Sequence, residues 1–178
     1  MADFGLRYPC FIAKGKTKGV VLGRLVTANL TVNTASGELY ADDELAERIE
    51  VFSSGNLAME TDELSDENAA EIYGCKVELG TVTYNKDDVA PRGALAYFKV
   101  KIISGKQSFK VFYYPQVSAV LGNDNAQTRG STITFQTTNT SFTIFADSEG
   151  DWRQTKVFET VDEAQDWINE KCGVSTTG

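Results

Sequence analysis

The sequence of 178 residues contains no histidine. Histidine is the commonest general base, a frequent transition-metal ligand and the base of most serine or cysteine nucleophile systems. Its absence argues against those chemistries and leaves carboxylate chemistry open. Cysteine is scarce as well, since Cys10, Cys75 and Cys172 lie far apart without a C-x-x-C pair. This spacing predicts three small buried thiols instead of a metal cage or a disulfide framework.

Long apolar segments are also missing. No run approaches the ~20 apolar residues that a membrane-spanning helix needs. The first residues, MADFGLRYPCF, lack the basic start and apolar stretch of a secretory signal. We therefore expect a protein that stays in the cytoplasm where it is made, unless a larger particle carries it out, and that does not insert into a membrane. The length suits one domain with a buried core and an arm or long loop.

Basic residues are rare in one stretch of the chain. The net charge is −8, and residues 42–71 hold 11 of the 25 acidic residues with a single base, Arg48. The local net charge is therefore −10, whereas the rest of the chain has 16 basic and 14 acidic residues. This asymmetry predicts one surface that repels polyanions and other surfaces that can meet it on a neighbouring copy.

Most of the remaining pattern predicts β-structure. In residues 20–33 apolar and polar side chains alternate from Val26 onward, as a half-buried strand requires. Turn residues at Ser36-Gly37, Ser104-Gly105-Lys106, Asn139-Thr140 and Asp147–Asp151 divide the chain. The predicted strands cover 20–33, 48–61 with an interruption at 53–56, two segments in 76–84, 94–103, 107–120, 131–138, 141–146 and 152–158, and 121–130 is a polar loop.

Two helices complete the prediction. Ser65 is a good N-cap, and Gly74 is placed to end a short helix. Thr160 and Glu163 form a capping box for a C-terminal helix that ends at Gly173. The predicted fold is a mainly β protein, a β-sandwich with one short and one C-terminal flanking helix. Its parts are an N-terminal arm (1–19), the sandwich domain (20–173) with loop 34–50 as an assembly arm, and a frayed tail (174–178).

Three short motifs resemble ligand-binding or catalytic motifs, but their sequence context disfavours each of these functions. Gly15-Lys16-Thr17 resembles the end of a phosphate-binding loop, but a strand follows where a helix is needed. The Asp147–Asp151 segment has alternating oxygen ligands, but position 12 of a calcium loop is Phe158, so a tight turn is favoured. Consecutive carboxylates at 42–44 diverge into water more often than they converge on a metal or a sugar.

Five segments, in order over nearly the whole chain, carry a family resemblance. They are GLRYPCF, LYADDELAERIEVFSSGNLAMETDELSDE, DDVAPRGALAYFKVK, AQTRGSTITFQTTNTSFTIFA and WRQTKVFETVDEAQDWINEK. Together they resemble the major tail protein family of long-tailed, non-contractile bacteriophages. The first matches the family's Gly-Leu-Arg-Tyr-Pro opening and the second its acidic loop, strand and Leu-Ser-Asp-Glu helix start. The third matches its Asp-Val-Ala-Pro turn, and the last two its final strand pair and terminal strand and helix.

The resemblance implies a tail tube protein of the virion, assembled in the host cytoplasm. Such proteins form six-fold rings in which each subunit gives strands to an inner β-barrel, and the rings stack helically into a tube for DNA ejection. The implied partners are further copies of the chain, the tape-measure protein and other tail proteins, and phage DNA that passes without specific binding. No catalysed reaction and no cofactor are implied. A closed barrel removes exposed strand edges, and head-to-tail stacking makes a filament.

Two sets of residues are candidates for the assembly. The first contains residues expected to make contacts between subunits: Arg7, Tyr8, Lys14, Lys16, Lys18, Asp42, Asp43, Glu44 and Glu47. Within it, the three lysines are expected to pair with the acidic residues of a neighbour. The second contains acidic residues expected on the lumen wall: Glu50, Glu60, Asp62 and Glu63. Lysines on that wall would bind the DNA and stall it.

Other functions stay open at this point. One alternative is another six-fold tail component, either a tail terminator or the inner tube of a contractile tail. Another is a β-sandwich module that binds a ligand on a virion or cell surface. An enzyme would have to depend on carboxylates such as Asp42 or Asp43.

Overall fold

The computed structural model describes residues 2–41, 44–122 and 136–175, and the chain is mainly β with antiparallel strands, as predicted. The strands are β1 (Ala2–Ala13), β2 (Val20–Val21), β3 (Leu25–Ala41), β4 (Glu44–Thr61), β5 (Lys76–Glu78), β6 (Thr81–Thr83), β7 (Arg92–Ile103), β8 (Lys106–Val120), β9 (Thr138–Phe145) and β10 (Gln154–Phe158). The helices are α1 (Asp66–Tyr73) and α2 (Val161–Cys172).

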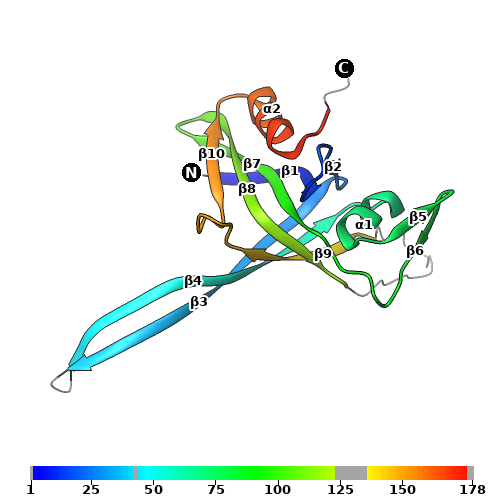
Figure 1. The fold of residues 1–178 in the computed structure, drawn as a ribbon. Coiled ribbons are helices and arrows are strands. Elements are labelled where there is room, and N and C mark those ends of the chain that lie inside the picture. Colours follow the sequence, from blue (N-terminus) through cyan, green and yellow to red (C-terminus); the bar gives the residue numbers. More distant parts are fainter. Residues whose placement is uncertain (1, 42–43, 123–135, 176–178) are drawn as a thin grey trace, which may run out of the picture.

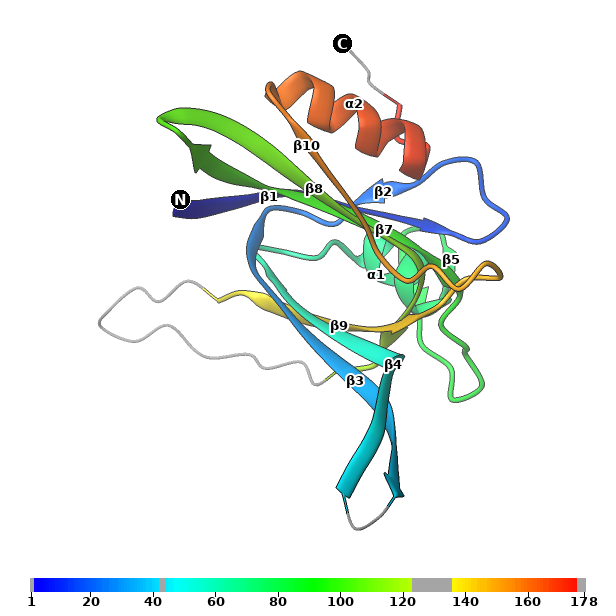
Figure 2. The same cartoon turned by 90° about the vertical axis from the view of Figure 1, so that its left-hand side faces the viewer.

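One large sheet holds most of the strands. Its order is β2-β1-β7-β8-β9-β4-β3, and β10 pairs with β8 beside this path. Strand β8 is the branch point, because residues 109–113 pair with β10 whereas residues 116–120 pair with β9. The two branches lie over each other as two layers, and β5 and β6 form a separate pair (Figure 1, Figure 2).

The main core lies between these layers. Leu95 and Tyr114 of the β7–β8 hairpin pack in one cluster with Leu57 of β4 and Phe142 of β9, and each is at most 1% exposed. The opposite face of the β7–β8 hairpin packs under α2, where Ile168 is fully buried. The hairpin therefore separates two cores, and α2 flanks the sandwich as the sequence predicted.

Both predicted helix caps are confirmed. The Ser65 hydroxyl accepts a hydrogen bond from the Asn68 N–H at 3.2 Å, and the Thr160 hydroxyl accepts one from the Glu163 N–H at 3.3 Å. Gly74 and Gly173 follow the last helical residues in the left-handed conformation, with φ of 73° and 59°. Glycine adopts this conformation without a Cβ clash, so it ends each helix at the predicted place.

Two predicted turns are confirmed. Ser104 and Gly105 join β7 to β8 with φ of 51° and 80°, and the positive values suit a two-residue hairpin turn. In the Asp147–Asp151 turn, the Asp147 carboxylate accepts hydrogen bonds from the backbone N–H groups of Glu149 (2.9 Å) and Asp151 (2.8 Å). That carboxylate therefore stabilises its own turn.

Two strands are longer than predicted. β3 runs through Ser36-Gly37 to Ala41, and β4 is continuous through residues 53–56. The two strands pair with each other throughout, so cross-strand hydrogen bonds outweigh the weak strand propensity of serine, glycine and asparagine. Asn33 pairs with Ser54 and Thr34 with Phe52, which leaves Ser53 as a β-bulge. The predicted loop 34–50 is thus the outer part of a hairpin.

The predicted N-terminal arm is also wrong in part. Residues 2–13 form β1, which pairs with β7 and buries Cys10 and Phe11 in the core. Register shifts interrupt the alternation between Phe4 and Leu6 and between Arg7 and Cys10. Gly5 and Tyr8 lie there at φ of 66° and 61°, so the strand has no regular apolar pattern in the sequence.

A predicted turn near the C-terminus is wrong as well. Asn139-Thr140 lies inside β9, where Asn139 pairs with Glu60 and Thr140 with Met59. The preceding predicted strand falls largely on residues 131–135, and most of the predicted loop 121–130 falls on residues 123–130, which are outside the described residues. The last residues of the predicted tail, 176–178, are outside them too.

Candidate assembly surfaces

The hairpin of β3 and β4 extends well beyond the body of the molecule (Figure 1, Figure 2). Strand β4 pairs with β9 only from Gly55 to Thr61, so among the described residues its outer part pairs with β3 alone. We call residues 34–41 and 44–54 the distal hairpin. At its base Phe52 stacks on Trp152, with ring centroids 4.5 Å apart and an interplanar angle of 3°.

The apolar face of this hairpin changes side at the bulge. In the inner part, Leu30 pairs with the buried Leu57, and both belong to the side that packs on the core. In the distal hairpin the opposite side is mostly apolar, because Ala35 pairs with Val51 and Gly37 with Ile49, and Glu47 lies on this side opposite Leu39. Ile49 and Val51 are 61% and 53% exposed. The distal hairpin therefore presents an apolar face away from its own core.

The other face of the distal hairpin is polar and internally bonded. Thr34 donates a hydrogen bond to Glu50 at 2.6 Å, and Tyr40 donates one to Glu38 at 2.9 Å. Arg48 lies 3.7 Å from Glu38 and 4.0 Å from Glu50. Of these contacts, Thr34–Glu50 and Arg48–Glu38 connect the two strands. All are between exposed groups and contribute little stability individually. This face suits water, whereas the apolar face does not.

Besides the outer part of β4, the strands β1 and β3 have long open edges among the described residues. β3 is the last strand of the sheet and pairs only with β4. β1 pairs with β7 along most of its length, but its other edge is covered only where Cys10 and Phe11 meet β2. Open edges present unpaired backbone N–H and C=O groups that can pair with another chain.

The basic candidates lie in the body and not on the hairpin. Lys14, Lys16 and Lys18 are exposed in the loop after β1, and Lys16 forms an ion pair with Glu71 of α1 at 2.6 Å. Arg7 is exposed on β1. Tyr8 is half-buried and donates a hydrogen bond to Asn169 of α2 at 2.7 Å, and burial raises its pKa. Tyr8 thus has a structural contact inside its own chain.

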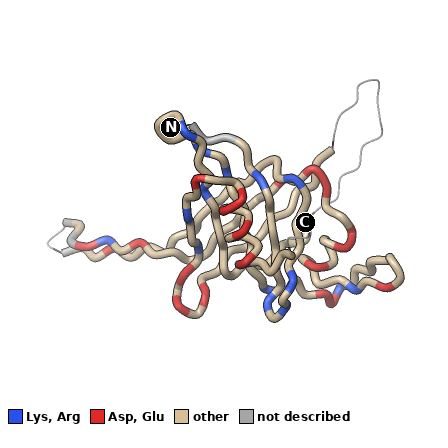
Figure 3. Tube along the Cα trace, turned by 90° about the horizontal axis from the view of Figure 1, so that it is seen from above, with Lys and Arg blue, Asp and Glu red and all other residues tan. Residues whose placement is uncertain are grey.

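Two of the acidic contact candidates lie near the outer end of the described hairpin. Glu44 begins β4 and Glu47 is exposed on it, whereas Asp42 and Asp43 are outside the described residues. Figure 3 shows acidic positions along the hairpin together with a basic one, Arg48, and positions of both signs on the body. Because the tip and the lysine loop are at different ends of the molecule, the structure does not bring the two predicted sets together within one chain (Figure 1).

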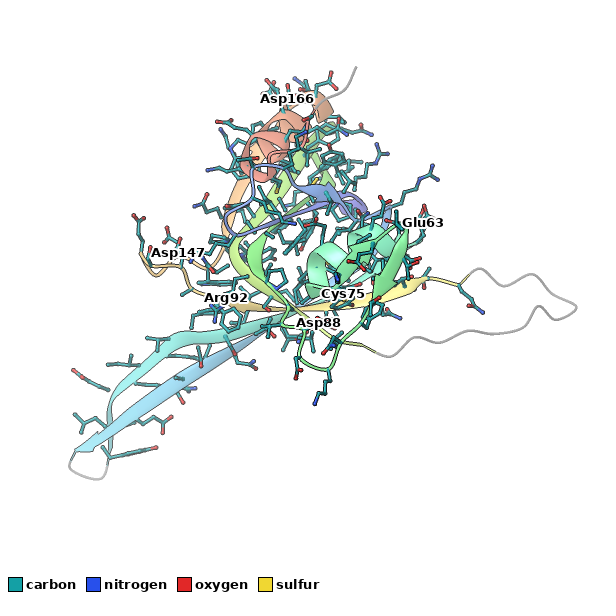
Figure 4. The ribbon with its side chains drawn as sticks, turned by 45° about the vertical axis from the view of Figure 1, so that its right-hand side comes forward. Glu63, Cys75, Asp88, Arg92, Asp147 and Asp166 are labelled. Carbon is teal, nitrogen blue, oxygen red and sulfur yellow. The ribbon has the colours of Figure 1, made fainter. Side chains whose placement is uncertain are left out.

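The lumen candidates do not form one group. Glu60 accepts hydrogen bonds from Thr27 at 3.4 Å and from Thr137, and Asp62 accepts one from the Arg24 N–H at 2.7 Å. Glu63 follows, exposed near α1 (Figure 4). Glu50 is apart from these three.

Glu50 and Glu60 also lie on opposite faces of the hairpin. Glu50 bonds Thr34, an even-numbered position of β3, whereas Glu60 bonds Thr27, an odd-numbered one. Successive side chains of a strand point to opposite sides, so these two carboxylates cannot share a face of the same ribbon. A single wall can contain one of them and not both.

The sequence reasoning missed the apolar set of the distal hairpin. Its signal is a change of phase in β3, where the apolar positions are even up to Val32 and odd from Ala35 to Leu39. The bulge at Ser53 carries the same change to β4, so Ile49 and Val51 lie on the face opposite Leu57. The change of phase places the apolar positions of the two halves on opposite faces of the same ribbon.

No protein-family model and no curated protein matches the sequence. Within the described ranges, neither helix is long and apolar enough to cross a membrane. In that same part of the chain, no three histidine, cysteine, aspartate or glutamate side chains are grouped so that they could hold a metal ion.

Proposed function

We propose that this protein is the building block of a phage tail tube, a hollow filament of stacked six-fold rings through which DNA leaves the virion. The observation that supports this most is the distal hairpin. It is a two-stranded ribbon with open edges and an exposed apolar face, and such a ribbon is marginally stable at best in water by itself. A partner surface that covers the apolar face would stabilise the hairpin.

The open edges of β1 and β3 support ring formation. A long open edge is an aggregation hazard unless it is paired or closed. If copies pair edge to edge around a symmetry axis, the ring closes into a barrel and no edge remains. The hairpin then contacts copies outside this ring, and head-to-tail contacts of that kind make an open filament.

Negative-stain electron microscopy of the purified protein tests the proposal. We expect hollow filaments of uniform width, formed without other proteins. Single discs that do not elongate would favour a tail terminator, and a monomer at all concentrations would favour a ligand-binding module. Either of these results would overturn the proposed function.

We further propose that the inner part of the hairpin forms the lumen wall. Its outward face carries Thr27, Asn29, Thr31 and Asn33 on β3, opposite Glu60, Ala58, Asn56 and Ser54 on β4. This face has hydroxyls, amides and one carboxylate, and no lysine or arginine. DNA carries one negative charge per ~1.7 Å of duplex axis, so a neutral to acidic wall lets it slide. Of the acidic candidates, this assignment favours Glu60 over Glu50.

Thiol labelling tests the position of this wall. In a Cys75→Ser background, Thr31→Cys should react with a small maleimide in both monomer and filament. A large polymer-linked maleimide should label it in the monomer and be excluded from the filament. Glu163→Cys, on the exposed side of α2, is the control that stays accessible to both reagents. Equal labelling of Thr31→Cys by the large reagent in the filament would place this face outside the lumen.

A further inference from the structure

Large hydrophobic side chains are exposed around α1. They come from the β5–β6 pair, from the segment that follows this pair and from the end of β8, and each is at least 43% exposed. A gathering of this kind marks an interaction surface more often than scattered apolar residues do. We call this set the α1 patch: Val77, Leu79, Tyr84, Val89, Val120 and Leu121.

The α1 patch is hollowed by two adjoining cavities of about 400 Å³ and 340 Å³. The cavities share Tyr73, Tyr84 and Leu121 as walls. Each also has one carboxylate in its wall, Asp66 in the first and Asp88 in the second (Figure 4). Among the described residues, no lysine or arginine forms an ion pair with either carboxylate. The surface is thus concave, largely apolar and acidic at both cavities.

The sequence around the patch has the same sign of charge. Residues 61–90 contain eight acidic and two basic residues, a net charge of −6, and Lys76 already pairs with Glu78 at 2.7 Å. This charge repels an acidic occupant, and it therefore disfavours the distal hairpin of another copy, since residues 34–50 have a net charge of −5. The patch instead suits a narrow, partly apolar segment that is positively charged.

The tip of the β7–β8 hairpin is such a segment. Residues 91–122 contain five basic residues and no acidic one. The turn consists of two residues, and the residues that flank it, Ile103 and Lys106, pair directly opposite each other. Side chains of such a pair lie on the same side of the ribbon, so the tip presents an apolar group next to an ammonium. Lys106 is exposed and forms no ion pair within the described ranges.

The tip and the patch are at opposite ends of β8. This strand begins at Lys106 and ends at Val120, and its 15 residues follow a path of about 45–50 Å at ~3.3 Å per residue. The turn lies on the far side of the body from α1 (Figure 1, Figure 2). One chain therefore cannot bury its tip in its own patch. Complementary surfaces at separate places on one subunit make a head-to-tail contact between copies.

Resting on the proposed function, we propose that the α1 patch receives the tip of the β7–β8 hairpin of another copy of this chain. Ile103 enters the apolar part of the cavities, and the Lys106 ammonium pairs with the Asp66 carboxylate. Asp88 already accepts a hydrogen bond from the Asn85 N–H at 2.7 Å, so Asp66 is the carboxylate to which we assign the ion pair. Each copy has one tip and one patch, and the contact links copies in series.

Cross-linking through the native Cys75, which lines the second cavity, tests the contact. Cys10 and Cys172 are fully buried, so Cys75 is the reactive natural thiol in the folded chain. Gln107→Cys protein, changed at an exposed position next to the tip, is treated under assembly conditions with a short bifunctional maleimide. It should give a ladder of dimers, trimers and longer species, and the ladder should disappear in the Gln107→Cys, Cys75→Ser double variant. Glu163→Cys, exposed on α2, is the matched control and should give no ladder.

A charge exchange tests the ion pair. Lys106→Glu and Asp66→Lys should each raise the protein concentration at which assembly begins by roughly 2- to 5-fold at low salt, as the loss of an exposed ion pair does. The double variant restores opposite charges at the contact, so its threshold should return toward that of the wild type. Additive losses in the double variant would contradict the proposed contact.

The outcomes separate this inference from the proposed function. Hollow filaments without a Cys75-dependent ladder from Gln107→Cys would show that the tip docks elsewhere while the tube remains. A Cys75-dependent ladder without filaments would support the contact and overturn the tube. A Cys75-dependent ladder from Ile49→Cys and not from Gln107→Cys would show that the distal hairpin occupies the patch. An equal ladder from Glu163→Cys would mean that the patch selects no particular segment, which also overturns the contact.

Discussion

Replacing Ile49 by aspartate should weaken association and leave the folded monomer almost unchanged. Ile49 is 61% exposed in the single chain. An exposed substitution of this kind changes monomer stability by about 0.5–1 kcal/mol, mainly through the poor strand propensity of aspartate. The expected loss of association is larger, because the proposed assembly buries the side chain that the monomer exposes.

The size of the effect follows from that exposure. Complete burial of an isoleucine is worth about 1.5–3 kcal/mol. Since 61% of Ile49 is exposed in the single chain, covering this exposed part contributes about 1–2 kcal/mol per contact. That energy corresponds to a change of roughly 5- to 30-fold in the association constant. Burying the new carboxylate without a partner adds to the loss.

Sedimentation of the assembled protein over a concentration series measures this change. The concentration at which filaments first form should rise by at least the estimated factor in Ile49→Asp. Ser36→Asp is the matched control, because Ser36 is exposed on the polar face of the same hairpin. The reasoning fails if both variants shift the threshold equally, or if Ile49→Asp assembles like the wild type.

Three further predictions concern the body of the molecule. Phe142→Ala should lower the free energy of unfolding by about 3–5 kcal/mol, because Phe142 is fully buried between the layers; denaturant titration measures this. Of the three thiols, only Cys75 should react with a thiol reagent in the native state, and all three should react in denaturant. Burial raises the pKa of Cys172 to about 12, so the folded state keeps its proton longer than the unfolded chain does. Stability should thus fall as pH rises above about 8.5, and fall less in Cys172→Ala.

Local signals account for what the sequence predicted correctly. Local contacts form the helix caps at Ser65 and Thr160 and the turn at Ser104-Gly105. Whether these features form therefore depends little on the rest of the fold. The alternation from Val26 to Val32 likewise locates the start of β3. These features are stabilised by contacts that a short sequence window contains.

Irregular strands account for most of the errors. In β1 the bulges at Gly5 and Tyr8 break the alternation, and β7, the strand that pairs with it, is 80 to 100 residues away in the sequence, from Ala13↔Gly93 to Ala2↔Ile102. In β3 the serine and glycine at 36–37 stay in a strand because β4 pairs with them. Which acidic residues share a face could not be predicted either, since the answer for Glu50 and Glu60 depends on whether Ser53 is a bulge.

The bulge at Ser53 divides one hairpin into two surfaces with different requirements. Inside it, Leu57 and Met59 are at most 2% exposed and hold the sandwich together. Outside it, Ile49 and Val51 remain exposed and contribute nothing to the core. If the protein associates as proposed, folding and association depend on separate residues of the same two strands. A large-to-small change at Leu57 should then lower the free energy of unfolding, and one at Ile49 should not. A hairpin that served only the fold could end at the bulge, and the part beyond it is the part to which the proposed assembly assigns a contact with another copy.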